Sequence, residues 1–568
     1  MRKTLLSLIV FLLLCSPAWA ASFTVCASGC DYTTIQAAID AASDNTGNTI
    51  EVQAGYTTTT EVLTVNKSGA SALAPLRIYT TSGKTVKGVT ISKSYIEIDG
   101  FTITPGPAGG VSDALIIFSA ANISNVKIMN NILKDAVVGA YGIQMYFSGM
   151  TVDNSPSSCT FSGNTFTWKD ANDAGTYGQT SESDYPRAMM VLQGVGHIVS
   201  GNDFSYVAGG DVIYIFGHDH TITGNTFHNI TYQGTDAQHT YQNSQHPDLF
   251  QSYSAVSYNI LIEKNFIRDS AYMQIGQVTQ DCAEAGVCAD YEGTATSVGS
   301  TTFTDSTKEW TTNGNANKLL HILSGTAIYK IYLIVSNSGT VLTVTDLEGN
   351  AVNLASDGVA EGDSYCIQMR AGWWTFRNNI FINIGTTDGG YFGNYAPYCK
   401  WHNNTFFNVN VGTATHSHIV EHYSHLHAGR GWYGEVKNNI FLGCGEVGVN
   451  TKGWYTSSNP SDTGVDTTTV HSNNYVANAD FSAKTGFSET GGVGSGNPYL
   501  SNTAGSLAIN FSLTAQSTIL IGAGANLSAS FTDDYAGTTR SVPWDIGAYE
   551  WFQTGNINGI TASGVTIQ

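Results

Sequence analysis

The chain has 568 residues, of which 24 are Lys or Arg and 44 are Asp or Glu, and its formal net charge is −20 at pH 7. This charge argues against nucleic acid and anionic membrane surfaces as partners, because both repel an acidic protein. Only 12% of the residues are charged and 61 are Gly, which argues against a helical protein and favours short strands joined by tight turns.

The first twenty residues have the pattern of a signal peptide. Arg2 and Lys3 form a basic start, residues 5–14 form an apolar segment, and Ala18-Trp19-Ala20 gives a small-x-small cleavage pattern. The apolar segment is too short to span a bilayer, and no other segment approaches ~18 apolar residues, so no membrane span is expected. We therefore expect a secreted, periplasmic or cell-surface protein.

The segment after the signal predicts a helical cap and the first of several disulfide candidates. Ile35, Ala38, Ile39 and Ala42 recur at the spacing of an amphipathic helix. Export permits disulfides, and the sequence leaves the connectivity open. The near neighbours Cys26 and Cys30 are one candidate pair. Another is Cys282 with Cys288, and an alternative partner for Cys282 is Cys366.

The central feature is an internal repeat in which an alternating apolar stretch precedes an Asn and then an aromatic or aliphatic residue. The anchor residues of its nine copies are Asn131, Asn164, Asn202, Asn225, Asn265, Asn379, Asn404, Asn439 and Asn474, with spacings of 33, 38, 23, 40, 114, 25, 35 and 35 residues. Such repeats predict coils of short strands whose inward residues stack on the next coil. An Asn at each corner can adopt the left-handed conformation and hydrogen-bond along the stack.

The 114-residue spacing predicts a separate module inside the repeat. Its residues read as hairpin-like strands with polar turns, which indicates a small β domain inserted into one coil. The expected organisation is a signal peptide at 1–20, a first solenoid part at 21–282, the insertion at 283–366, a second solenoid part with a C-terminal cap at 367–552, and a tail at 553–568.

Two segments carry a resemblance to known proteins. The stretch FTVCASGCDYTTIQAAIDAAS resembles the start of secreted pectate-lyase-like β-helix proteins, and Asp533–Trp551 resembles the closing segment of bacterial β-helix repeat proteins. The resemblance implies an all-β protein with a right-handed parallel β-helix solenoid, a helical N-terminal cap and a small inserted β domain. This scaffold is used by lyases, hydrolases, epimerases and adhesins, so the resemblance does not select a chemistry.

One set of polar residues precedes the anchors by about 14 to 17 positions in three consecutive coils. Aligned in this way, Arg187, Asp211 and Asp248 stack on one strand face, with Tyr214 and Gln251 in a parallel column. Two carboxylates one coil apart would either share a cation such as Ca²⁺ or raise the pKa of one of them, as an acid/base pair requires. The adjacent Arg would neutralise a substrate carboxylate.

His246 lies two residues before Asp248, so both side chains would face the same side of a strand. This arrangement suits a general base held by a carboxylate. The phrase His-x-Asp-x-x-Gln, which ends at Gln251, resembles one found in bacterial β-helix proteins that act on polysaccharides. The alternative interpretation is a polar edge next to a proline-ended loop.

Further substrate-binding candidates come from histidine-rich coils. They are His218, His220, His418, Glu421, His422 and the aromatic Tyr391. A His-x-His pair on a strand would bind a transition metal, line a groove that hydrogen-bonds sugar hydroxyls, or form a solvated surface.

The sequence thus favours an extracellular polysaccharide lyase, hydrolase or epimerase with Asp211, Asp248, His246 and Arg187 as catalytic residues and Asp211 and Asp248 as Ca²⁺ ligands. The alternative is a non-catalytic glycan-binding or adhesin-type surface protein. The glycan and the oligomeric state are left open.

Overall fold

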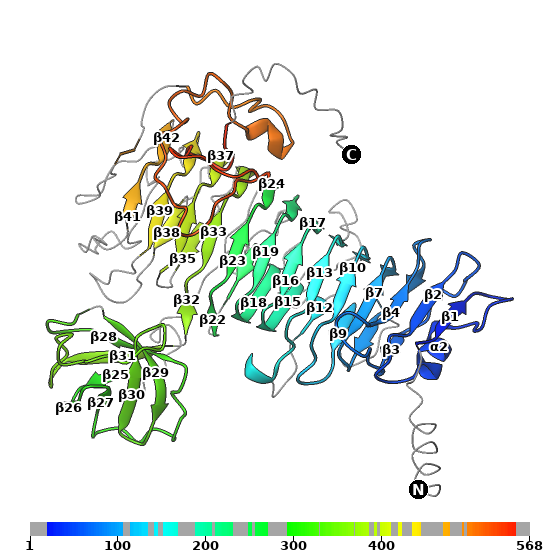
Figure 1. The fold of residues 1–568 in the computed structure, drawn as a ribbon, viewed down its shortest axis with the longest axis horizontal. Helices are drawn as coiled ribbons and strands as arrows, with labels where there is room; N and C mark the ends of the chain where they lie inside the picture. The colour runs from blue at the N-terminus through cyan, green and yellow to red at the C-terminus, as the bar shows by residue number, and fades with distance from the viewer. Residues whose placement is uncertain are drawn as a thin grey trace, which may run out of the picture.

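A computed structural model describes residues 20–105, 114–134, 141–145, 152–168, 188–206, 211–230, 248–252, 256–270, 292–328, 330–368, 370–384, 391–394, 398–409, 418–422, 434–444, 470–477, 491–492 and 497–551. In these ranges the chain winds into a right-handed parallel β-helix, which confirms the predicted fold class. Figure 1 shows the coils stacked from the blue N-terminal end to the yellow and orange C-terminal end. The predicted signal segment, up to residue 19, lies outside the described residues.

Three parallel sheets form the sides of the solenoid, and strands of successive coils lie next to one another in each sheet. The thirteen-stranded sheet has the order β1 (Ser22–Val25), β2 (Thr49–Val52), β4 (Leu76–Tyr79), β7 (Ile96–Asp99), β10 (Lys127–Met129), β13 (Thr160–Ser162), β16 (Ile198–Ser200), β19 (Thr221–Thr223), β23 (Leu261–Glu263), β33 (Thr375–Arg377), β36 (Lys400–His402), β39 (Glu435–Lys437) and β41 (Val470–Ser472).

The eleven-stranded sheet contains β5 (Thr85–Val86), β8 (Thr102–Ile103), β11 (Ile132–Lys134), β14 (Thr165–Thr167), β17 (Asp203–Ser205), β20 (Thr226–His228), β24 (Phe266–Ser270), β34 (Ile380–Ile384), β37 (Thr405–Val409), β40 (Ile440–Leu442) and β42 (Tyr475–Ala477). The nine-stranded sheet contains β3 (Leu63–Val65), β6 (Val89–Ile91), β9 (Ile116–Phe118), β12 (Tyr141–Gln144), β15 (Ala188–Val195), β18 (Asp211–His218), β21 (Phe250–Gln251), β22 (Ser257–Tyr258) and β32 (Ala371–Gly372). A short 3₁₀ turn, η1 (Val152–Asn154), precedes β13.

The nine anchor residues form one continuous hydrogen-bonded column, which we call the Asn ladder. Each side-chain Nδ2 donates to the Oδ1 of the next anchor at 2.9–3.2 Å. All nine residues are buried. Each amide also serves backbone groups: Asn225 Nδ2 donates to the Val199 carbonyl at 2.9 Å, and its Oδ1 accepts the Asn202 N–H at 2.9 Å. The ladder therefore satisfies polar groups at a corner that water does not reach.

The left-handed conformation lies one residue before the position that we predicted. The residue that precedes each anchor from Asn131 onward has a positive φ, for example Gly201 at 63°, Gly224 at 64° and Asn378 at 54°. These turn residues bend the chain between the thirteen- and eleven-stranded sheets, and glycine adopts this conformation without a steric cost. The anchors themselves remain free to point inward and pair.

Inward aromatic residues fill the core beside the Asn ladder. Phe166, Phe204 and Phe227 stack in successive coils, with ring centroids 4.5 and 4.9 Å apart. A second stack contains Phe381, Phe406 and Phe441, at 4.6 and 4.8 Å. Each stacked pair adds roughly 0.5–1.5 kcal/mol beyond the burial of its area. The stacked Phe residues therefore stabilise the same register between coils that the Asn ladder sets.

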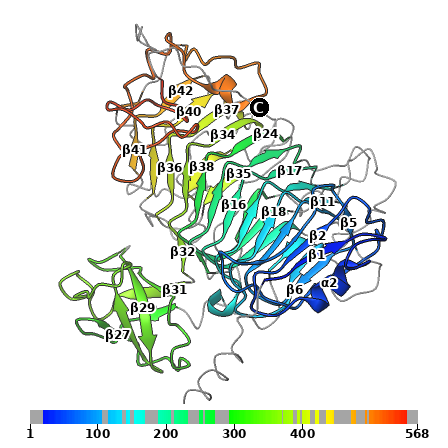
Figure 2. The same cartoon turned by 45° about the vertical axis from the view of Figure 1, so that its right-hand side comes forward.

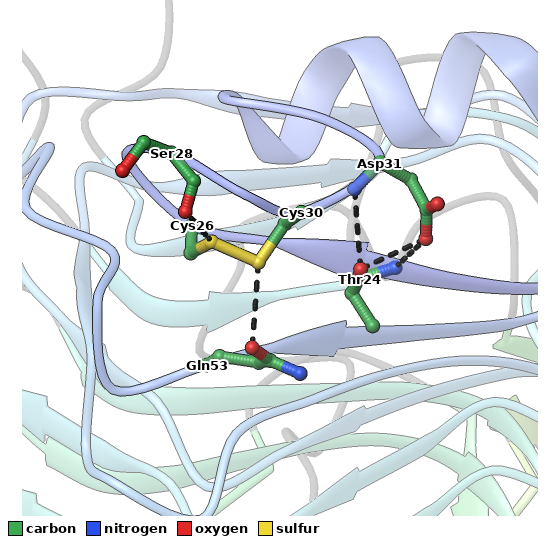
Figure 3. Close-up of a disulfide and its surroundings, with 6 residues drawn as sticks. All are labelled: Thr24, Cys26, Ser28, Cys30, Asp31 and Gln53. Atoms are coloured by element: carbon green, nitrogen blue, oxygen red, sulfur yellow. Dashed lines mark hydrogen bonds between the residues drawn. A yellow bond between two sulfur atoms is a disulfide. The ribbon is translucent and has the colours of Figure 1, made fainter.

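The predicted N-terminal cap is present as helix α2 (Ile35–Ala41), with Ile35, Ala38 and Ile39 buried. The Cys26–Cys30 disulfide closes the loop between β1 and this helix, as Figure 3 shows. Beside it, the Asp31 carboxylate accepts the Thr24 N–H and hydroxyl, both at 2.8 Å. These hydrogen bonds lower the pKa of Asp31. The other predicted disulfides involve Cys282 and Cys288, which lie outside the described residues.

An antiparallel sheet interrupts the solenoid between β24 and β32. Its order is β25 (Glu292–Thr294), β31 (Ser364–Gln368), β28 (Leu319–Ile322), β29 (Ile331–Asn337), β30 (Val341–Thr345), β27 (Thr302–Thr304) and β26 (Ser297–Val298). This inserted module has its own core, and Figures 1 and 2 show it beside β32 and away from the coil stack.

The inserted module contacts the solenoid through an apolar patch. Leu319, Ile331 and Leu333 of the module form one cluster with Trp373 and Tyr398 of the solenoid. The two aromatic rings come from successive coils and stack with centroids 5.0 Å apart and an interplanar angle of 10°. This contact holds the module next to the chain segment that returns to the solenoid.

The described part of the C-terminal segment lies along the side of the last coils, and the predicted cap at their end stays a prediction. Residues 497–551, which we call the C-terminal strap, include η6 (Ala508–Phe511) and pack along the outer face of the eleven-stranded sheet. Phe511, Leu520 and Ile546 of the strap cover Ile382 and Ile440 of the sheet. The outer positions of these coils are apolar, so the strap buries them, and Figure 1 shows it over β37 and β42.

We expect Asn225→Ala to lower the free energy of unfolding by about 2–3 kcal/mol, because it leaves the Val199 carbonyl and the Asn202 N–H without their partner. The neighbouring Thr226→Ala is the matched control, since Thr226 faces outward and is half-buried. Chemical denaturation followed by circular dichroism measures both. Equal stability of the two variants would show that the ladder does not hold the coils.

Candidate functional site

The outer face of the nine-stranded sheet carries a row of aromatic side chains. In β18 the residues alternate, so that Ile213 and Ile215 are fully buried in the core whereas Tyr214, Phe216 and His218 face outward and remain partly exposed. The Tyr214 and Phe216 rings lie 6.0 Å apart. Partly exposed aromatic rings in a row on one sheet face are suited to stacking on sugar rings.

An acidic cluster lies where this row begins. Asp211 is 6% exposed and Asp248, one coil further, is fully buried. The Asp211 Oδ1 accepts the Asp248 N–H at 2.7 Å. Burial, followed by the charge of Asp211 and the hydrogen bond that Tyr214 donates to it, raises the pKa of Tyr214 well above its ordinary value. The phenol therefore stays protonated at neutral pH, with its hydroxyl directed to Asp211.

The column that contains Asp211 differs from the prediction in one residue. Ala188 pairs with Asp211, in the place that the sequence predicts for Arg187. Ala188 precedes its anchor Asn202 by 14 residues, as Asp211 precedes Asn225, whereas Arg187 precedes it by 15. Strict use of the anchor spacing would have found this. Arg187 itself lies outside the described residues, as does His246.

The predicted pairing of Tyr214 with Gln251 is present, and it explains the longer spacing of Asp248. Strand β18 pairs with both β21 and β22, with Tyr214 opposite Gln251 and His218 opposite Tyr258. The partner of Tyr214 is 37 residues further along the chain and that of His218 is 40, so three extra residues separate β21 from β22. Asp248 and Asp211 therefore stay in one column although their distances to the anchors differ.

Tyr141 is a member of the cluster that sequence reasoning missed. It pairs with Ala188 and so lies in the column of Asp211, two coils away, and its charge contributes to the raised pKa of Tyr214. The alternation of side chains from Tyr141 to Met145 could have indicated this strand, but the comparison of coils in the sequence began only at Arg187.

A second cluster lies at the far end of the row. The His218 ring stacks on the Tyr258 ring, with centroids 4.5 Å apart and an interplanar angle of 10°. The Arg370 guanidinium carbon lies 3.9 Å from the centroid of the same Tyr258 ring. His218 Nδ1 also lies 2.6 Å from Asp219 Oδ2. Tyr258 and Arg370 were not among the predicted residues. Tyr258 precedes Asn265 by seven residues, as His218 precedes Asn225, so the repeat contained the signal for it.

His220 is not a groove residue, because it is buried inside the solenoid at 1% exposure. Its ring stacks on buried His197 at 4.9 Å, and its Nδ1 accepts the His197 N–H at 3.1 Å. His197 Nδ1 in turn accepts the Cys159 N–H at 3.1 Å. This pair forms an internal ladder like that of the Asn residues. Burial lowers the pKa of His197 to about 4 and that of His220 well below its ordinary value.

Four further predicted residues come together on a separate pair of strands. Strands β35 (Tyr391–Asn394) and β38 (His418–His422) run parallel, with Tyr391 opposite His418. Glu421 lies opposite Gly393 and His422 opposite Asn394. Their backbone register thus places all four on neighbouring strands.

The predicted Ca²⁺ site stays a prediction. Asp211 and Asp248 supply two carboxylates, one of which already accepts a hydrogen bond from the backbone and another from Tyr214. Calcium takes six to eight oxygen ligands, and the part of the chain that is described holds no group of three or more His, Cys, Asp or Glu residues suited to a metal ion. We therefore assign no catalytic step to a metal.

Neither the comparison with protein-family models nor that with curated proteins gave a match. Among solved structures, pectate lyase Pel9A is similar with a TM-score of 0.41 and 12% identity, over 94% of this chain and 97% of that one. The A-module of the mannuronan C-5 epimerase AlgE6 from Azotobacter vinelandii gives a TM-score of 0.31 and 11% identity, over 82% and 94%.

The tailspike protein of E. coli bacteriophage HK620, solved with a pentasaccharide, gives a TM-score of 0.28 and 12% identity, over 81% and 74% of the two chains. These likenesses concern the parallel β-helix alone. Within the described residues, none of the helices is long and apolar enough to cross a bilayer.

The buried histidine pair predicts a loss of stability in acid. Because the folded pKa of His197, about 4, lies below its ordinary value of 6.5, the unfolded chain binds the proton first. The stability is fully present above pH ~6.5 and falls as the pH drops towards 4, by about 3 kcal/mol for this residue. Unfolding at a series of pH values measures the slope.

His197→Asn keeps a hydrogen-bond acceptor near the Cys159 N–H and removes the titration, so it should flatten the slope. His228→Asn is the control that should not flatten it, because Asp203 raises the pKa of His228 through a hydrogen bond. An unchanged slope in His197→Asn would contradict the assignment.

Proposed function

We propose that this protein is an extracellular enzyme that acts on a polysaccharide along the outer face of the nine-stranded sheet. The observation that carries the proposal is the protonated, partly exposed Tyr214 hydrogen-bonded to buried Asp211 at the start of an outward aromatic row. Cleavage of a glycosidic bond, by hydrolysis or by elimination, requires one group that gives a proton and one that takes a proton.

In the proposed mechanism Tyr214 gives its proton to the departing glycosidic oxygen, and Asp211 positions the phenol. Gln251, which pairs with Tyr214, would hold a sugar hydroxyl. The second group, which takes a proton from the sugar or from water, is assigned to His246. As the sequence predicts, the Asp248 carboxylate would hold this base in place. Phe216 and His218 continue the row along which neighbouring sugars would stack.

A second candidate function is glycan binding without turnover. It is favoured by the two hydrogen bonds that Asp211 already accepts, from Asp248 and from Tyr214, because a carboxylate engaged in this way also suits a purely structural role. In that case the aromatic row would bind the glycan and the acidic cluster would only stiffen the strand.

Tyr214→Phe separates the two functions, because it removes the hydroxyl and keeps the ring. We expect turnover to fall by about 10²-fold or more, with little change in glycan affinity or melting temperature. The assay is incubation with neutral and acidic polysaccharides, with and without Ca²⁺, followed by the ultraviolet absorbance of unsaturated products and by reducing ends. A rise in both signals for the wild type indicates elimination, and reducing ends alone indicate hydrolysis.

Asp211→Asn should also lose turnover, and Asp203→Asn is its matched control. Asp203 pairs with His228 at 3.0 Å on the eleven-stranded sheet, away from the row. Glycan binding by a wild-type protein that releases no product from any polysaccharide would overturn the enzymatic proposal and leave the binding function.

A further inference from the structure

The cluster at the far end of the aromatic row has the features of an anion-binding subsite. We infer that Arg370, held against Tyr258 and His218, binds the carboxylate of an acidic sugar in the glycan. This inference rests on the proposed function only in that a glycan occupies this face, and it does not require turnover.

The three side chains form a stack of planar groups. His218 lies nearly parallel to Tyr258, and the Arg370 guanidinium lies over the Tyr258 ring at 3.9 Å. His218 and Tyr258 have the same register in successive coils. A guanidinium that uses its face on an aromatic ring keeps its N–H groups directed sideways, in the plane of the group. Those N–H groups are the donors that a carboxylate accepts in a two-point contact.

Charge pairing singles out Arg370 among the arginines. The described residues include five Arg, of which Arg77, Arg268, Arg377 and Arg540 lie within 4.0 Å of a carboxylate. Arg370 forms no such ion pair with the part of the chain that is described, although the whole protein carries a net charge of −20. In an acidic protein, an arginine fixed by stacking rather than by a carboxylate is available to an anion from outside.

Asp219, an acidic residue in contact with the stack, is already engaged. Asp219 pairs with His218 through one carboxylate oxygen, and the other oxygen accepts a hydrogen bond from Asn259. Asp219 therefore orients the His218 ring rather than neutralising the charge of Arg370.

The position of Arg370 follows from backbone contacts of Arg370 itself and of the residues that follow it. Its carbonyl accepts the Ser257 N–H at 3.0 Å, and the next residues, Ala371 and Gly372, pair with β22. Trp373 then contacts the inserted module. Arg370 is thus fixed where the chain returns from the module, in register with Phe216 and so two strand positions, roughly 7 Å along the strand, from the level of Tyr214. A bound chain could contact Tyr214 and Arg370 with different sugar residues.

The carboxylate is the chemical group that this geometry selects. It is planar and presents two oxygens at the spacing of the guanidinium N–H groups, and the partly buried setting strengthens the contact. A neutral sugar would gain only the stacking contacts of the row. Arg370 would therefore set a preference for uronic-acid glycans over their neutral counterparts.

The test compares Arg370→Gln with the wild type for binding to a uronic-acid polysaccharide and to the same polymer after reduction of its carboxyl groups. We expect the variant to lose about tenfold in affinity for the acidic polymer, about 1.4 kcal/mol, and nothing for the reduced one. Arg268→Gln is the matched control, because Arg268 also lies near an aromatic ring, that of Phe266, but pairs with Asp269.

Isothermal titration in the Tyr214→Phe background keeps this result separate from catalysis. Selective loss of acidic-polymer binding supports the inference whether or not the wild type turns the polymer over. Equal affinities of Arg370→Gln and the wild type for the acidic polymer would overturn it, as would an equal loss for the reduced polymer. Arg370→Lys, which keeps the charge but not the planar fork, should recover only part of the affinity.

Discussion

The Asn ladder is the interaction on which the remaining features depend. Its amides hydrogen-bond from coil to coil in a buried column, so they fix which residue of one coil lies over which residue of the next. Every outward column then follows from the same register, including the pairing of Tyr214 with Gln251 and of His218 with Tyr258. A long, regular outer surface is obtained in this way without any single loop defining it, because short strands repeat the same geometry.

The three sheets divide the surface into parts with different roles. The strap covers the outer face of the eleven-stranded sheet at its C-terminal coils, and the module contacts the corner at Trp373 and Tyr398. The nine-stranded sheet keeps partly exposed aromatic residues together with buried acids at the start of β18. This sheet also carries Tyr214, a protonated phenol, and Arg370 lies next to it at the start of β32, stacked on Tyr258.

Much of the fold could be predicted from the sequence because its signals are local and repeated. The anchors, the inward Phe residues and the helix at Ile35 each follow from spacing alone. The site was harder to predict. The prediction missed that the column of Asp211 contains Ala188, because strand positions were counted only approximately from the anchors. His220 was predicted to face the groove because the alternation was followed past Asp219, where a positive φ of 60° turns the chain. Arg370 was missed because it follows the insertion, where the repeat gives no spacing to count from.

The turn residues before the anchors have a consequence for how the solenoid comes apart. Under the strap these residues are Asn378, Asn403, Asn438 and Asn473, and each side-chain amide donates to a strap carbonyl at 2.9–3.0 Å. In the coils before these the same position is Asn130, whose amide donates to Asp99 instead, and then glycine at 163, 201 and 224, which offers no such bond. The strap therefore ties these four coils, and through the Lys264–Asp533 ion pair also the coil before them, into one cooperative block, whereas the earlier described coils are joined to their neighbours. On heating or under mechanical force, the N-terminal coils would thus unfold one after another, whereas the C-terminal coils would unfold together.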